Sequence, residues 1–132
     1  MSYETVLSGL EAIFAGVPGM GPVLRGEPSS IQTYPTLYSE LDRATIVRSG
    51  QVRTWQYRIL HRMVFQQQDF QQAETDLIPF INAVPNAVDA DARLGGRLVA
   101  GGAQIDDIRA VWVSIGGTDC RALDFYSIVV EK

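Results

Sequence analysis

Residues 51–65 read QVRTWQYRILHRMVF, and this stretch decides the fold. Its side chains alternate between apolar and polar over most of its length, as they do in a strand with one buried face. The apolar set consists of Trp55, Tyr57, Ile59, Met63 and Phe65. The opposite set consists of Thr54, Gln56, Arg58 and Arg62, joined by Leu60 and Val64. The pattern predicts one long strand whose first set, Trp55 included, packs into a core.

The residues before this strand predict a helix followed by two strands. Apolar side chains recur at steps of three and four over residues 3–14, and Ser2 is placed to cap the helix that this spacing predicts. A short strand is expected at residues 23–25 and a longer one at residues 36–41. The connection over residues 42–50 is too long for a tight hairpin turn, and we expect it to project as a β-arm.

The residues after the long strand predict a second helix and three more strands. The helix is expected to open at Asp69, with Gln72 completing a capping box, and to end at Pro85; because Pro79 lies inside it, a kink is expected near Asp76 or Leu77. One further helical turn is expected over residues 89–94. Strands are expected over residues 97–105, 110–115 and 121–130, with a hairpin turn over 116–119 between the last two.

This order of elements predicts the fold class. Helix, strands, helix and strands indicate an α+β fold, with a mixed or antiparallel β-sheet and two main helices packed on one face. The 132 residues fit a single domain over residues 1–132, and neither a repeat nor a linker interrupts them.

Composition and charge exclude several classes of protein. The net charge is −4, and the eleven Lys and Arg residues are scattered, so a nucleic-acid reader is not expected, although a protein can surround DNA without gripping it. Cys120 is the one cysteine, which rules out an internal disulfide and favours a reducing compartment. The N-terminus lacks the pattern of a signal peptide and no apolar run reaches the ~20 residues of a membrane span, so synthesis in the cytoplasm is expected.

The candidate reactive residues are few. His61 is the one histidine and shares parity with the buried face, which favours a hydrogen-bonded core residue over a catalyst. Zinc sites use clusters of His and Cys that the sequence lacks, and its paired glycines match no phosphate-binding loop. The acidic pairs Asp106–Asp107 and Asp89–Asp91 fit a loop and a helix start. We therefore expect no catalytic residue, no metal ligand and no cofactor.

Contact chemistry is concentrated at residues 43–53. This stretch mixes apolar and arginine side chains, both common in protein interfaces. We expect it to contact another subunit or partner, and a mobile, solvated loop is the alternative. The residues concerned are Arg43, Ile46, Val47, Arg48 and Arg53.

The pattern as a whole resembles the tail terminator proteins of long-tailed phages, also called minor tail or tail completion proteins. The resemblance covers nearly the full chain and includes its length. Its marks, in order, are the helix over residues 4–14, Tyr34-Pro35-Thr36-Leu37-Tyr38, Thr54-Trp55-Gln56, the helix end from Leu77 to Pro85, the Gly-containing strand pair, Phe125-Tyr126 and the Glu131-Lys132 end. This family has no invariant catalytic signature.

The resemblance implies a structural virion protein rather than an enzyme. Terminator subunits form a ring, usually a hexamer, on the head-proximal end of the tail tube, where they stop tube polymerisation and present a surface for head–tail joining. The implied partners are copies of the chain, the major tail tube protein and the head connector, and DNA passes through the lumen without specific binding. The implied location is the head–tail junction of the virion, after assembly in the bacterial cytoplasm.

Two further expectations follow from the resemblance, and two alternatives stay open. The stretch from Arg43 to Arg53 is expected to contact the tail tube or a neighbouring subunit. An acidic lumen lets DNA slide, and Asp106 and Asp107 are the candidates to face it. One alternative is a head–tail connector, stopper or neck protein of the same particle. The other is a small enzyme or ligand-binding domain that uses His61 with Asp124 or an aspartate pair.

Overall fold

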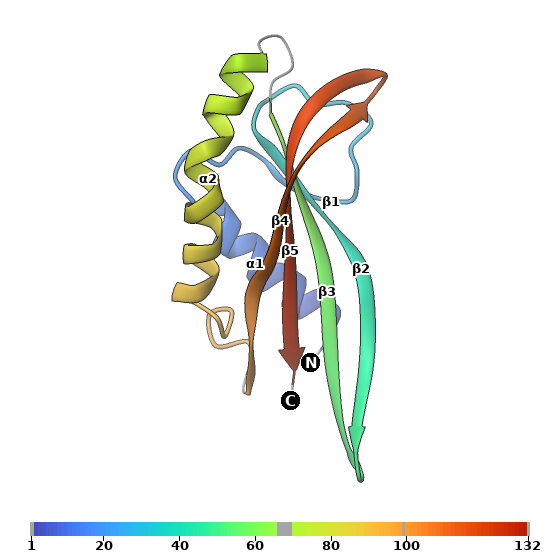
Figure 1. Cartoon of the computed structure of the whole chain (residues 1–132). Coiled ribbons are helices and arrows are strands. Elements are labelled where there is room, and N and C mark those ends of the chain that lie inside the picture. Colours follow the sequence, from blue (N-terminus) through green and yellow to red (C-terminus); the bar gives the residue numbers. More distant parts are fainter. Residues whose placement is uncertain (1, 66–69, 99, 132) are drawn as a thin grey trace.

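In the part of the chain that the structure describes, residues 2–65, 70–98 and 100–131, five strands form one sheet and two helices pack on it (Figure 1). This structure is a computed structural model. The elements are α1 (Tyr3–Ala15), β1 (Val23–Arg25), β2 (Thr36–Ser49), β3 (Val52–Val64), α2 (Phe70–Ala90), β4 (Gly101–Ile115) and β5 (Thr118–Glu131). The strand order is β1-β2-β3-β5-β4, and only β1 and β2 run parallel among the neighbouring pairs described. The predicted single-domain α+β fold with a mixed sheet is confirmed.

Both helices lie on the same side of the sheet, which we call the inner face (Figure 1). Helix α1 begins where the Ser2 hydroxyl accepts a hydrogen bond from the Thr5 amide, and it buries one apolar stripe. Helix α2 buries a stripe of the same kind. The side chains of the two stripes in the main core are Val6, Leu10, Phe14, Ala73, Leu77, Phe80, Val84 and Val88. They pack against the alternating apolar positions of β3 and β5, so the alternation seen in residues 51–65 builds the core.

The turn between β2 and β3 is tighter than the sequence suggested. Strand β2 continues to Ser49, and Gly50 and Gln51 alone connect Ser49 to its cross-strand partner Val52. Gly50 adopts φ 63°, a conformation that glycine reaches without strain. The expectation of a long connection was wrong because a register shift at Asp42 lets the strand continue past a break in its pattern. The expected β-arm is present as the outer end of this hairpin.

A second bulge joins two predicted strands into one. Strand β4 begins at Gly101 and runs to Ile115 without the loop expected at Asp106 and Asp107. The register shifts between Ile105 and Asp107, so Asp106 is an inserted residue and the strand continues beyond it. The predicted hairpin turn follows β4, where Gly116 and Gly117 lead into β5.

Helix α2 does not end where its proline predicted. It continues through both Pro79 and Pro85 to Ala90. Val88, beyond the second proline, is fully buried in the main core, and such packing outweighs the local preference of a proline to end a helix. The separate turn expected over residues 89–94 therefore begins within the helix. The expected start at Asp69 lies outside the described residues.

Candidate functional site

The outer end of the β2–β3 hairpin projects beyond the rest of the sheet (Figure 1). Strand β5 pairs with β3 only from Trp55 onward, and β1 pairs with β2 only up to Ser39. We call residues 43–53 the arm: all of its β2 part lies past β1, and within the described residues its outer part, residues 47–53, also lies past β5 and is a two-stranded ribbon. Isolated two-stranded hairpins are only marginally stable in water. The arm thus offers backbone edges and side chains for contact with another chain.

The structure brings the predicted interface residues together on this arm. Every residue of β2 from Glu40 to Ser49 is exposed, and at the tip Val52 is 67% exposed. Strand pairing places Ile46 beside Trp55 and sets Arg48 opposite Arg53, on the same face of the ribbon as Ile46. Val47 points to the other face. Both faces of the arm therefore present apolar side chains to solvent.

Trp55 lies at the base of the arm rather than in the core. The sequence predicted a buried ring, but Trp55 is only partly buried and packs against the main core from its margin. Its indole stacks on the Tyr57 ring at 6.1 Å between centroids with planes 4° apart, and the Arg53 guanidinium lies 5.8 Å from the indole. This stack links the arm to the core.

His61 is a fully buried core residue. Its Nδ1 lies 2.7 Å from the Ser39 Oγ and its Nε2 lies 2.8 Å from the Ser127 Oγ, while the Phe14 ring meets it edge-on. Burial lowers the pKa of His61 to about 3, so the imidazole stays neutral near pH 7. Asp124 lies on the opposite face of the sheet, paired with Arg62, so the structure does not bring His61 and Asp124 together.

Sequence reasoning missed both serines. Ser39 and Ser127 are directly opposite His61 or diagonal to it on the two neighbouring strands. The only signal for this contact is the strand register, which the sequence of one strand does not contain.

The face of the sheet opposite the helices, the outer face, carries a cluster of aromatic and charged groups. The Tyr126 ring has the Arg58 guanidinium 4.4 Å from its centroid and that of Arg109 at 5.3 Å. Arg58 bonds to Asp42 at 3.4 Å, and Arg109 bonds to Asp107 at 2.8 Å. These contacts join β2, β3, β5 and β4 across the sheet, and they too depend on register.

The two aspartates predicted to face a lumen have different surroundings. Asp106 is exposed at the bulge of β4. Asp107 is half-buried and its charge is offset by Arg109. Whether either faces a lumen stays a prediction, and the pairing leaves Asp106 as the stronger candidate.

Reactive groups are sparse in the described part of the chain. Among those residues no three His, Cys, Asp or Glu side chains gather in a way that could hold a metal ion. Cys120 is buried, its thiol points to the Thr118 carbonyl at 3.6 Å, and burial raises the pKa of the thiol, so little nucleophilic thiolate forms near pH 7.

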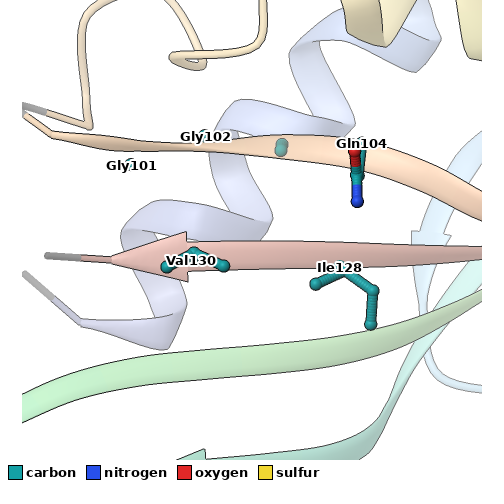
Figure 2. A pocket seen from close by; sticks show the side chains of 6 residues that line it. Gly101, Gly102, Gln104, Ile128 and Val130 are labelled. Carbon is teal, nitrogen blue, oxygen red and sulfur yellow. The ribbon is translucent and has the colours of Figure 1, made fainter. Parts of the chain in front are cut away.

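A shallow hollow of about 450 Å³ lies where β4 and β5 meet at the edge of the sheet (Figure 2). Its lining consists of Gly101, Gly102, Ala103, Gln104, Ile128 and Val130. Gln104 supplies the single polar side chain of this lining, and an amide neither gives up nor takes a proton near pH 7. The hollow can receive an apolar group but offers no acid–base chemistry.

None of the helices in the described residues is both long and apolar enough to pass through a bilayer. The most extended feature of the described residues is the arm, which exposes apolar and arginine side chains. No known family model matches the chain, and no curated protein matches it in sequence.

Proposed function

We propose that the chain is a tail terminator: a structural protein that forms a ring on the head-proximal end of a phage tail tube, ends tube polymerisation and offers a surface to the head connector. The arm is the observation that carries this proposal. The partners would be copies of the chain, the tail tube protein and the connector, in a virion assembled in the bacterial cytoplasm.

The arm supports an assembly role because it is costly to expose without a partner. A ribbon that extends past its neighbouring strands gains little stability from the core, yet it displays Ile46, Val47 and Val52 to solvent. Protein interfaces use apolar anchors and arginines in this way, and the arm holds Arg48 and Arg53 beside those anchors. Burial of the arm by another subunit removes this exposed apolar surface from water.

The charge distribution supports passage of DNA through such a ring. The net charge is −4. On the outer face, Arg58, Arg62 and Arg109 each donate a hydrogen bond to an aspartate. Arginines whose charge is already offset hold phosphates weakly, so DNA can slide past them.

The test is to add the purified chain to polymerising tail-tube protein from the same genome and to measure tube lengths by negative-stain microscopy. A terminator caps one end of each tube, shortens the length distribution in proportion to its concentration, and appears as a ring at that end. Tubes of unchanged length with bare ends would overturn the proposal. Binding to the connector with unlimited tube growth would identify a neck protein instead.

A shortened arm provides the matched variant. Deleting residues 48–49 together with residues 52–53 removes two facing pairs and leaves Val47 opposite Thr54 beside the Gly50–Gln51 turn. Facing residue pairs in an antiparallel ladder alternate between hydrogen-bonded and non-hydrogen-bonded pairs. Deleting two pairs therefore leaves a pair of the same type next to the turn. We expect this variant to fold and to lose capping. Capping at the wild-type level would rule out a role for the arm tip.

A further inference from the structure

Six of the eight exposed large apolar side chains in the described residues fall into two groups on different parts of the sheet, and Leu24 and Leu41 lie outside both. One group lies on the arm, which belongs to β2 and β3. The other lies beside β4, at the far edge: Ile78 on α2 is 60% exposed and Trp112 on β4 is 53% exposed, and Ile81 on α2 is also exposed. A ring needs two different side patches that meet head to tail, so two separate apolar patches on opposite edges fit that symmetry.

The second group forms a continuous strip, which we call the α2–β4 edge. Glu74, Ile78 and Ile81 follow one another at steps of four and three, so they share one side of α2. Glu74 bonds to Arg121 on β5, and the Arg121 guanidinium lies 5.1 Å from the centroid of the Trp112 ring. The side of α2 that carries the two isoleucines is therefore the side that meets Trp112, and α2 runs beside β4 (Figure 1).

Among the described residues, the strand at this edge has a second strand on one side only; on its other side, the Ala103 amide donates a hydrogen bond to the Ala92 carbonyl. Strand β4 pairs with β5 alone in the described part of the chain, and it is 15 residues long. Long edge strands readily accept another chain unless something covers them. The bulge at Asp106 and the exposed Trp112 show that the edge is neither short nor uniformly charged.

The two surfaces carry opposite charge. The arm, residues 43–53, contains three arginines and no acidic residue. Helix α2 contains no basic residue and three acidic ones: Glu74, which is already paired with Arg121, and Asp76 and Asp89. Attraction between such surfaces steers association and disfavours arm-to-arm contact, in which like charges meet.

We propose that the occupant of the α2–β4 edge is the arm of a second copy of this chain, so that each subunit of the ring holds its neighbour by one arm. This inference rests on the proposed ring and adds the pair of surfaces that closes it. The apolar side chains of the arm meet Ile78, Ile81 and Trp112, and its arginines face the acidic side chains of α2. Because the two surfaces differ, the contact repeats around a closed ring and leaves no arm unused.

The test uses one variant for each surface. The arm variant is Ile46→Thr with Val47→Thr and Arg48→Ser, which keeps strand-forming side chains at the first two positions. The edge variant is Ile78→Gln with Ile81→Gln, which keeps helix propensity. Leu24→Ser, on β1 and away from both surfaces, is the matched control. Circular dichroism verifies folding, and sedimentation velocity with native mass spectrometry measures assembly.

We expect the wild type and the control to form rings and each surface variant alone to be monomeric. An equimolar mixture of the two variants should stop at heterodimers, because the intact arm of one docks on the intact edge of the other and both remaining surfaces are defective. If either variant does not fold, Val52→Thr and Trp112→Gln replace them in the same experiment.

Three results would overturn the inference: normal rings from the edge variant, no heterodimer in the mixture, or a wild type that stays monomeric at its highest attainable concentration. The tube assay separates this failure from failure of the proposed function. If the edge variant assembles and caps tubes normally, the proposed arm-to-edge contact is refuted while the terminator role is still supported. If the wild type forms rings that never cap tubes, the terminator role is refuted while the arm-to-edge contact is still supported.

Discussion

At the scale of the residue, burial of His61 makes stability depend on pH. Burial lowers the pKa of His61 to about 3, whereas an unfolded histidine titrates near 6.5. Between these values the unfolded chain binds a proton that the folded chain does not. The stability that the neutral His61 gives is therefore complete above about pH 6.5 and is lost progressively as pH falls toward about 3, at up to about 1.4 kcal/mol per pH unit.

This first prediction is checked by urea unfolding of the wild type and His61→Gln over a series of pH values. The variant lacks the imidazole, and the carboxylates titrate in both proteins, so their effects cancel in the difference between the two free energies of unfolding. We expect that difference to be constant above about pH 6.5 and to shrink steadily below it. A difference that does not change with pH would show that His61 has the same pKa in the folded and the unfolded chain.

Arg62 and Asp124 make the second prediction at this scale. Arg62 Nε and Nη2 donate to the two carboxylate oxygens of Asp124 at 2.7 and 2.8 Å, and the Asp124 side chain is only 3% exposed. Arg62→Ala leaves that carboxylate buried without its guanidinium. Since Arg62 is itself partly exposed, we expect a loss near the lower end of the about 3–5 kcal/mol that breaking a buried pair costs.

Equilibrium urea unfolding measures this loss. The double variant Arg62→Met with Asp124→Leu is the control, because it removes both charges and keeps apolar volume at both positions. It should regain most of the stability that Arg62→Ala loses. A double variant as unstable as the single one would mean that packing of the arginine stem, rather than the stranded carboxylate, causes the loss.

At the scale of the element, the arm and the core of one hairpin should differ in dynamics. Strands β2 and β3 pair from Thr36 to Ser49 with one bulge at Asp42. Only the inner part of this hairpin packs under the helices and has β5 as a neighbouring strand. Backbone amides with few buried neighbours open at low free energy. We predict that amides of residues 45–54 exchange with deuterium quickly in the monomer, while those near Ile59 and Met63 stay protected.

Assembly provides the contrast for this third prediction. In the ring the arm lies against the next subunit, so exchange over residues 45–54 should slow markedly, and so should exchange over 78–81 and 108–112 on the receiving edge. Hydrogen exchange with mass spectrometry on separated monomer and ring resolves these peptides. Slowing in the arm without slowing at the receiving edge would place the arm on another partner, such as the tube.

The elements that follow a simple period were predicted from sequence with nearly correct bounds, whereas those that contain a bulge or a proline were predicted with the wrong ends or as two strands instead of one. The alternation from Trp55 to Phe65 and the stripe of α1 gave the core strand and first helix because a single period runs through each. The bulges at Asp42 and Asp106 shift that period by one residue, so each hides the continuation of its strand. Pro85 misplaced the end of α2 because contacts from distant strands hold the helix past it.

The candidate site was predictable only where its residues are neighbours in sequence. The arm carries its apolar and arginine side chains in one short stretch, so composition alone marked it. The α2–β4 edge joins Glu74 through Arg121 to Trp112, three residues that come together only after β4, β5 and α2 have packed. The cluster around Tyr126 depends on strand register in the same way.

At the scale of the whole molecule, the chain separates charge along its sheet. The arm carries three arginines and no acidic residue, helix α2 carries three acidic residues and no basic one, and the sum over the chain is −4. Subunits that align these ends attract each other, and subunits that align like ends repel. If the chain forms the ring proposed above, single subunits would already carry the charge pattern that sets the direction of the ring.

This separation leads to the last prediction, that salt weakens the ring. Screening shortens the reach of a charge from about 10 Å at 0.1 M salt to about 3 Å at 1 M, so attraction between exposed arginines and carboxylates fades over that range. Sodium chloride is the suitable salt, because sulfate strengthens apolar burial and would mask the effect. We expect the ring's dissociation constant to rise with sodium chloride in sedimentation equilibrium. Arg48→Gln with Arg53→Gln should assemble more weakly than the wild type at low salt and respond less to added salt. If the wild-type ring tightens with salt, apolar contacts alone close it and the charges serve only to exclude the wrong orientation.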